Sequence, residues 1–303
     1  MTIPMTRTES LPRIRFETGS RVGIVAGGGK LPEAVADSLE VQDHKPFVVI
    51  LEGEADPTGP LGSHDHSLLK LEHFAELVPL LKRNRVTHVV LAGEVKRRPR
   101  LSKMRLNASL LVALPRLAIE LSRGDDGLLR AILRYIERRG IKVVGAHEVV
   151  PELVALEGCY TKITPQASDR RDIDAARTAA EAIGALDIGQ GAVAIGGRVI
   201  ALEGIEATDG LLARVRDLRG HGRLAGKTRG VLVKCAKPGQ EARADLPSIG
   251  PNTVEGAHAA GLAGIAVEAG HSLVLDGPAM VERANALGLF VVGLPPKEKS
   301  HGG

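Results

Sequence analysis

The chain has very few aromatic residues and no long apolar run. Its 303 residues include four phenylalanines, two tyrosines and no tryptophan, so the cores must consist mainly of leucine, valine, isoleucine and alanine. Proteins that stack the bases of single-stranded nucleic acid need several aromatic rings, and this composition disfavours a nucleic-acid partner. No apolar run approaches 18 residues, which excludes a transmembrane helix.

Cysteine and net charge are also scarce. Cys159 and Cys235 are the only cysteines, and two distant cysteines form neither a disulfide framework nor a zinc-ligand pattern. We expect two free thiols in a reducing cytosol. The net charge of +4 suits an anionic partner without proving one. Residues 1–20 lack the apolar region of a secretory signal and are expected to be an extension.

Apolar strand patterns alternate with helical patterns in the first half of the chain. Strands are expected at 21–26, 47–51, 88–91 and 141–144, and helices at 32–42, 74–85 and 127–140. This alternation predicts an α/β domain over residues 21–150, with a parallel sheet and crossover helices.

A second domain is expected over residues 169–296. Residues 151–168 show no periodicity and are interpreted as the linker between the domains. Gly196-Gly197 separates two apolar segments and predicts a hairpin. Helices and further strands follow, so this half is predicted to be a distinct, mixed α/β domain that carries the main catalytic acids.

Three glycines directly after the first expected strand form the first candidate site. Gly27, Gly28 and Gly29 precede Lys30 and a helix that begins near Pro32. Amides at such a turn can bind a phosphate, and Lys30 adds a positive charge. The alternative is a plain tight turn. The spacing matches neither GxGxxG nor a P-loop, which argues against dinucleotide binding.

Polar clusters in the second half supply further candidates. Gln190 lies between two glycines, in either a binding turn or a structural one. Glu206 and Asp209 surround Thr208, so this segment either binds Mg²⁺ or places Thr208 as a helix N-cap.

Lysines and an acid follow a later apolar strand. Lys234 and Lys237 precede Asp245, and cations with a nearby acid suit phosphoryl chemistry. A solvated loop with ion pairs is the alternative. His147, at the end of an expected strand, is a candidate pocket residue.

A basic stretch from Lys96 to Arg105 precedes an apolar segment at 108–121. Six cations there favour peripheral association with an anionic membrane surface, although a solvated basic face is an equal alternative.

Nine motifs occur in order between Arg21 and Leu294 and together resemble one family. They are VGIVAGGGKLP, GDDGLLR, GAHEV, DIGQGAV, EATDGLL, KPGQE, DLPSIG, GLAGI and GLFVVG. The chain is similar to the UDP-2,3-diacylglucosamine pyrophosphatases of the LpxI type. The resemblance implies a Rossmann-like N-terminal domain and a distinct α/β C-terminal domain, with the lipid substrate between them.

The resemblance also implies a reaction. Such enzymes are Mg²⁺-dependent and hydrolyse UDP-2,3-diacylglucosamine to UMP and 2,3-diacylglucosamine 1-phosphate (lipid X), with water attacking the phosphorus on the sugar side. The step belongs to lipid A synthesis in Gram-negative bacteria, which implies the cytoplasmic face of the inner membrane. Asp245 matches the family's critical acid and Thr208 a threonine of its TD pair.

Roles for the other residues follow by combining both lines of reasoning. Asp245, Glu206 and Asp209 are the expected metal ligands. The expected substrate-binding residues are Gly27, Gly28, Gly29, Lys30, Gln190, Lys234 and Lys237. A homodimer is one assembly that the sequence leaves open.

Two alternatives to this enzyme remain. A regulatory protein that binds a nucleotide sugar without turnover would keep the glycine turn. A dinucleotide-dependent oxidoreductase would need the missing GxGxxG, although Glu52 could supply the acid after the second strand.

Overall fold

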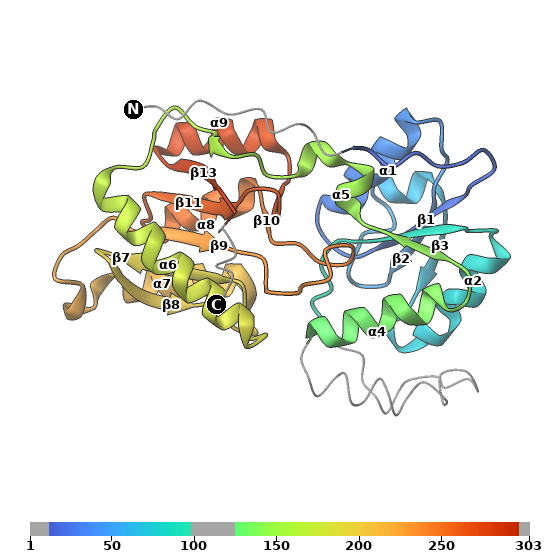
Figure 1. Cartoon of the computed structure of the whole chain (residues 1–303), viewed down its shortest axis with the longest axis horizontal. Coiled ribbons are helices and arrows are strands. Elements are labelled where there is room, and N and C mark those ends of the chain that lie inside the picture. The colour runs from blue at the N-terminus through green and yellow to red at the C-terminus, as the bar shows by residue number, and fades with distance from the viewer. Residues whose placement is uncertain (1–11, 98–124, 297–303) are drawn as a thin grey trace, which may run out of the picture. The chain divides into compact units, whose positions relative to one another are not determined.

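The computed structural model describes residues 12–97 and 125–296. The chain divides into two compact units, which are not sequential halves. One unit comprises Leu11–Pro151 together with the short segment Glu241–Asp245. The other comprises Glu152–Gln240 and the described residues from Leu246 onward. Figure 1 shows the elements of each unit with their labels.

The first unit contains a five-stranded, fully parallel sheet in the order β3-β2-β1-β4-β5. The strands are β1 (Val22–Ala26), β2 (Phe47–Leu51), β3 (Asp65–Leu69), β4 (His88–Ala92) and β5 (Lys142–Val144). The helices are α1 (Leu31–Val41), η1 (Pro60–Ser63), η2 (Leu71–Glu76), α2 (Leu77–Arg83), α4 (Asp125–Glu137) and α5 (Ala146–Val149). The alternating pattern predicted this parallel sheet with crossover helices, and the strand order gives the Rossmann-like domain that the family resemblance implied.

Aliphatic side chains on both faces hold this sheet in place. On one face, Val49 and Val89 pack with Leu81 of α2 and Ile136 of α4 in a buried cluster. Helices α1 and α5 contact the sheet through β1 and β4. All five residues of β1 and all five of β2 are buried, as expected for parallel strands with helices on both sides.

The turn between β1 and α1 lies against the backbone that follows β4. The Gly27 N–H donates to the Ala92 carbonyl at 2.8 Å, and the Gly28 N–H donates to the Glu94 carbonyl at 2.7 Å. A Cβ on Gly27 would lie 2.5 Å from the Glu94 carbonyl oxygen. Glycine at position 27 is therefore required by the close approach of two backbone segments.

The second unit contains a six-stranded mixed sheet in the order β6-β13-β11-β9-β7-β8, and a two-stranded sheet of β10 and β12. The strands are β6 (Gly158–Cys159), β7 (Gly191–Ile195), β8 (Arg198–Leu202), β9 (Val231–Lys234), β10 (Ser248–Ile249), β11 (Gly264–Glu268), β12 (Leu273–Val274) and β13 (Phe290–Leu294). The helices are η4 (Pro151–Leu153), α6 (Ala167–Ala185), α7 (Ala207–Asp217), η5 (Leu218–Gly220), η6 (Gly222–Leu224), α8 (Pro251–Ala259) and α9 (Gly277–Leu287).

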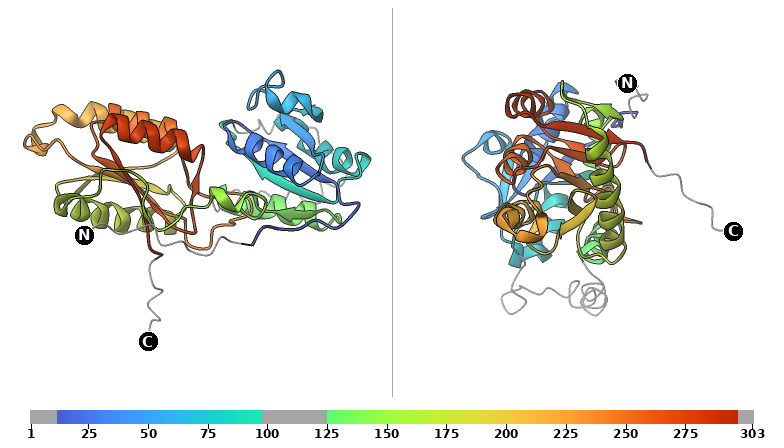
Figure 2. Two further views of the ribbon diagram at one scale, coloured as in Figure 1. Left: turned by 90° about the horizontal axis from the view of Figure 1, so that it is seen from above. Right: turned by 90° about the vertical axis from the view of Figure 1, so that its left-hand side faces the viewer.

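Helices cover both faces of the six-stranded sheet, as the views in Figure 2 show. Val193 and Leu232 point into a cluster with residues of α7, α8 and α9. Their strand neighbours Ala192 and Val233 point into a second cluster, with residues of α6. The period-two alternation along β7 and β9 therefore serves two separate cores.

The predicted α/β class and the separate mixed second sheet are confirmed. The hairpin is confirmed too, because β7 pairs antiparallel with β8 and Gly196 and Gly197 both have positive φ. The sequence did not predict β3 or α8. Strand β3 is an edge strand with exposed polar residues, and α8 is short and contains glycine.

The segment interpreted as the linker, residues 151–168, contains two regular elements. Helix η4 lies at its start, and β6 pairs antiparallel with β13. Thr161 is buried, and its hydroxyl accepts the Val291 N–H at 3.0 Å. Within residues 12–97 and 125–296, we find no helix with the length and apolar character needed to cross a bilayer.

We expect Gly27→Ala to lower the free energy of unfolding by about 1–3 kcal/mol, because the new methyl group would overlap the Glu94 carbonyl. Urea unfolding monitored by circular dichroism measures the change. Gly59→Ala is the matched control in the same unit, since its Cβ would lie no closer than 3.5 Å to any neighbouring atom. Equal stability of the two variants would contradict the steric role of Gly27.

Candidate functional site

Several predicted site residues lie where β9 ends and β7 begins in the second unit. Lys234, the last residue of β9, pairs with Gly191, the first residue of β7. The Cys235 N–H donates to the carbonyl of Gln190 at 3.0 Å, so Gln190 and Lys234 lie at the same end of the strands. The carboxyl ends of the parallel strands β9, β11 and β13 also lie at this end of the sheet, where α/β proteins commonly bind ligands.

The side chain of Glu203 connects two segments at this end of the sheet by hydrogen bonds. Its side chain is almost fully buried, with 5% of its surface exposed. One carboxylate oxygen accepts the Gln190 N–H at 3.2 Å, and the other accepts the Thr208 hydroxyl at 3.0 Å. A Cβ at Gly191 would lie 2.6 Å from a carboxylate oxygen of Glu203, so this glycine leaves room for the buried carboxylate. A Cβ at Gly189 would lie 2.3 Å from the backbone carbonyl oxygen of Glu203.

Thr208 is tied to Glu203 and does not cap α7. The N-cap position is Glu206, whose side chain makes no capping hydrogen bond. The alternative expectation of Thr208 as the N-cap is wrong, because α7 begins at Ala207 and Thr208 lies inside its first turn. The side-chain oxygen of Gln190 is buried and finds no hydrogen-bond partner among the described residues.

Lys234 and Lys237 have different environments. Lys234 is 5% exposed, and its ammonium group donates to the Ser248 carbonyl at 2.9 Å. Within the described parts of the chain we find no ion pair for it. Lys237 forms an ion pair with Asp187 at 2.7 Å. Among the described residues, the ammonium group of Lys234 thus contacts a backbone carbonyl rather than a carboxylate.

The acids predicted to bind metal differ in their surroundings. Glu206 forms an ion pair with Arg214, whereas Asp209 is exposed in the first turn of α7. Asp245 belongs to the other compact unit. In residues 12–97 and 125–296, no three histidine, cysteine, aspartate or glutamate side chains gather as a metal-binding cluster.

Asp245 ends the segment Glu241–Asp245 of the first unit. The amides of Ala244 and Asp245 both donate to the Glu241 carbonyl, at 2.9 and 3.1 Å, which folds the segment into a turn. Ala244 packs against the core of this unit. Asp245 is partly buried.

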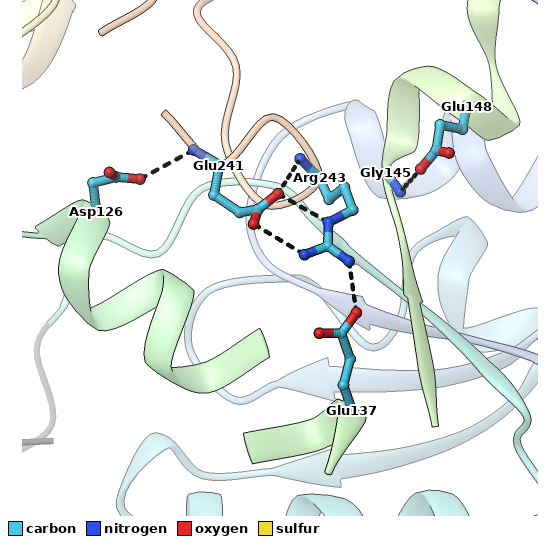
Figure 3. Close-up of polar contacts among 6 residues, drawn as sticks. All are labelled: Asp126, Glu137, Gly145, Glu148, Glu241 and Arg243. Carbon is cyan, nitrogen blue, oxygen red and sulfur yellow. Dashed lines mark hydrogen bonds and ion pairs between the residues drawn. The ribbon is translucent and has the colours of Figure 1, made fainter. Parts of the chain in front are cut away.

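Charged side chains surround this turn, as Figure 3 shows. Arg243 contacts both carboxylate oxygens of Glu241, at 2.9 and 3.0 Å. Arg243 also lowers the pKa of Glu241, which stays ionised at neutral pH. The hydrogen bonds that Arg243 donates to Glu241 in turn raise the pKa of Arg243.

The turn also lies beside α5. The His147 ring packs near Gly145, where a Cβ would lie 3.2 Å from the Arg243 Cα. Burial lowers the pKa of His147, and the charges of Glu148 and Glu241 oppose this effect only in part. The Glu148 carboxylate accepts the Gly145 N–H at 2.7 Å and fixes the start of α5. His147 is therefore biased toward the neutral form near Asp245's segment.

The turn Gly27–Gly29 offers a phosphate fewer hydrogen-bond donors than the sequence suggested. The amides of Gly27 and Gly28 already donate to backbone carbonyls. Lys30 forms an ion pair with Glu33 at 2.9 Å. The exposed Gly29 has a positive φ and lies directly before α1. A phosphate at this turn would depend on the groups from Gly29 onward.

The predicted residues thus fall into two groups. Gln190, Thr208, Lys234, Lys237, Glu206 and Asp209 belong to the second unit, whereas Gly27, Gly28, Gly29, Lys30 and Asp245 belong to the first. The sequence did not reveal that Glu203 holds Thr208, or that Arg243 bonds to Glu137. The contact between Glu203 and Thr208 had one signal in the sequence, which is an acid directly after an apolar strand pattern.

Solved structures resemble the chain only remotely. A putative NAD-dependent epimerase/dehydratase from Methylobacillus flagellatus is 14% identical, covers 40% of this chain and 34% of its own, and has a TM-score of 0.22. An isoflavone reductase is 10% identical, covers 93% of this chain and 80% of its own, and has a TM-score of 0.26. Scores this low carry no argument.

Sequence comparison gives a much stronger match. The chain is 41% identical over 283 residues to the UDP-2,3-diacylglucosamine pyrophosphatase LpxI of Caulobacter vibrioides, covering 92% of this chain and 99% of that protein. The model of the LpxI N-terminal domain matches residues 21–153, and that of the LpxI C-terminal domain matches residues 156–292. The chain therefore belongs to the LpxI family.

Proposed function

We propose that this protein hydrolyses the pyrophosphate bond of UDP-2,3-diacylglucosamine and releases UMP and 2,3-diacylglucosamine 1-phosphate, a step of lipid A synthesis. The observation that carries the proposal is the match, over nearly the full length of both chains, to a pyrophosphatase named for this substrate. The match includes both domains of the family.

The lysines at the carboxyl end of β9, in the sheet of the second unit, suit a diphosphate substrate. Lys234 holds a positive charge in a nearly buried position and donates to a backbone carbonyl rather than to a carboxylate. A fixed cation with little access to water stabilises the negative charge on a transferring phosphoryl group more strongly than an exposed one. In the proposal, Lys234 and Lys237 bind phosphate oxygens, and Gln190 offers its buried side-chain oxygen to a donor on the nucleotide sugar.

Asp245 and Thr208 are the proposed catalytic residues. An ionised carboxylate can orient the attacking water and accept its proton. The Thr208 hydroxyl donates to Glu203, which leaves the lone pairs of its oxygen directed elsewhere. In the proposal, water attacks the phosphorus on the sugar side, Asp245 takes up its proton, and UMP is the leaving group.

An Mg²⁺ ion is part of the proposal. Mg²⁺ commonly binds through one or two carboxylates and completes its shell with water and phosphate oxygens, so three clustered protein acids are not required. In the proposal its carboxylate ligands come from Asp245, Glu206 and Asp209, and Glu206 would first have to release Arg214. The bound ion would neutralise charge on the diphosphate oxygens.

Incubating the purified protein with UDP-2,3-diacylglucosamine and Mg²⁺ should release UMP, and EDTA should abolish the release. In H₂¹⁸O the label should appear in 2,3-diacylglucosamine 1-phosphate and not in UMP, because attack occurs on the sugar side. Binding of the substrate without release of UMP would contradict the proposal and favour the nucleotide-sugar-binding regulator.

Asp245→Ala should lower kcat by about 10²- to 10⁴-fold, because the variant lacks the group that accepts the proton of the attacking water. KM should change much less, since this role is needed mainly in the transition state. Steady-state kinetics and a thermal melt measure both effects. Asp217→Ala, at an exposed position of α7, is the matched control. A near-normal kcat in Asp245→Ala would remove Asp245 from the mechanism.

Peripheral binding to the anionic inner face of the inner membrane is also proposed. Each cation near an anionic surface contributes about 1 kcal/mol. Of the six cations in the basic stretch, Lys96 and Arg97 have acidic partners, Glu94 at 3.7 Å and Glu54 at 3.1 Å. The other four, Arg98, Arg100, Lys103 and Arg105, lie outside the described residues, as does the apolar segment 108–121.

Flotation with liposomes should therefore show binding to anionic vesicles and much weaker binding to neutral ones. The double variant Lys103→Glu/Arg105→Glu should bind anionic vesicles several-fold less, because the local charge is reversed. Lys82→Glu/Arg83→Glu, at exposed positions of α2, is the control for overall net charge. Equal loss in both double variants, or equal binding to neutral vesicles, would contradict a role for the basic stretch.

A further inference from the structure

The segment Glu241–Asp245 belongs to a different unit from the residues directly before and after it. Glu152–Gln240 and the described residues from Leu246 onward belong to the second unit, whereas the five residues between them belong to the first. A segment of five residues cannot bury a core of its own. Its conformation must therefore be imposed by the groups that it contacts.

Arg243 supplies the strongest of these contacts. Its Nε donates to one carboxylate oxygen of Glu241 at 2.9 Å, and Nη2 donates to the other at 3.0 Å. Its Nη1 donates to Glu137 at 2.6 Å. The guanidinium thus bridges an acid of the segment and an acid at the last residue of α4, as drawn in Figure 3.

A second contact comes from the other end of α4. The Asp126 carboxylate accepts the Glu241 N–H at 3.2 Å and forms an ion pair with Arg130 at 2.7 Å. Asp126 and Glu137 lie eleven positions apart, which corresponds to roughly 16 Å along the helix axis. The segment is therefore held at two well-separated points of one helix, which restricts its rotation as well as its position.

These contacts determine the backbone that carries Asp245. The Asp245 N–H donates to the carbonyl of Glu241, the residue that both Asp126 and Arg243 hold. Loss of the bridge to Glu137 would leave the turn of Glu241–Asp245 intact but free to shift on α4.

We propose that Arg243 is a positioning residue, which with Glu137 and Glu241 holds Asp245 in the place that the reaction requires. This inference rests on the proposed function. Arg243 and Glu137 are each about one-third exposed, and ion pairs with such access to water contribute little to overall stability. A displacement of about 1 Å, in contrast, can cost 10²-fold in rate. The effect on catalysis should therefore exceed the effect on stability.

Arginine is needed here because of its geometry. The three nitrogen atoms of its planar guanidinium group donate to three carboxylate oxygens, two of Glu241 and one of Glu137. Lysine offers a single point charge and cannot bridge Glu241 and Glu137 in the same way. Arg243→Lys should therefore rescue activity only in part.

The test compares Arg243→Met, Arg243→Lys and Glu137→Gln with the unmodified protein in the UMP-release assay. Arg243→Met should lower kcat about 10- to 100-fold with KM changed less than about 3-fold. The kcat values of Arg243→Lys and Glu137→Gln should lie between those of Arg243→Met and the unmodified protein. Glu137→Gln also keeps the test valid if Arg243→Met does not fold.

The matched control is Arg283→Met, which breaks the exposed ion pair with Glu255 in the second unit. We expect it to keep full activity. In the Asp245→Ala background, Arg243→Met should cause no further loss, because Arg243 acts only through Asp245. Hydrogen exchange of peptides that cover 241–246 should be faster in Arg243→Met than in the unmodified protein.

The outcomes separate the two proposals. Unmodified protein that releases no UMP overturns the proposed function, whatever the exchange rates are. Active unmodified protein with a fully active Arg243→Met variant overturns the role of Arg243 alone. An additional loss in the Asp245→Ala background also overturns it, because Arg243 would then act on the substrate directly.

Discussion

Burial of both faces of each central sheet is the constraint from which the site follows. With helices on either side, strands such as β1, β7 and β9 contain almost only small or aliphatic residues. Polar groups can then lie only where strands end, and the described chemistry gathers there: Lys234 at the end of β9, Gln190 before β7, and Glu203 after β8. The position of the site is thus a result of how the cores are packed.

Polar groups at these strand ends are themselves partly buried and must bind one another. Glu203 illustrates this requirement, since one of its carboxylate oxygens accepts a hydrogen bond from the turn before β7 and the other from the first turn of α7. Breaking either bond would leave a buried oxygen atom without that partner, which is costly. Glu203 therefore links the turn before β7 to the start of α7, and Thr208 has its orientation set by a residue that need not touch any substrate.

The sequence predicted those parts of the fold that depend on local pattern. Periodicity located β1, β2, β4 and the β7–β8 hairpin, but not β3, whose exposed polar residues lie at a sheet edge. Phosphate chemistry singled out Lys234 and Asp245 as candidates. It could not reveal that Arg243 binds Glu137, because residues 106 positions apart in sequence meet only through tertiary structure. Nor could spacing show that the Gly27 and Gly28 amides are used by the backbone after β4.

Because Glu241–Asp245 belongs to the first unit, the protein cannot be cut into two independent domains at the boundary between the two family models. The two family models meet between residues 153 and 156, as if one cut separated two modules. A polypeptide that begins there would contain Arg243 without Glu137 and Glu241 without Asp126. The complementary fragment would contain Glu137 without Arg243, although Asp126 would keep its ion pair with Arg130. The two halves are thus interdependent, and neither half produced alone could hold the Asp245 segment on α4.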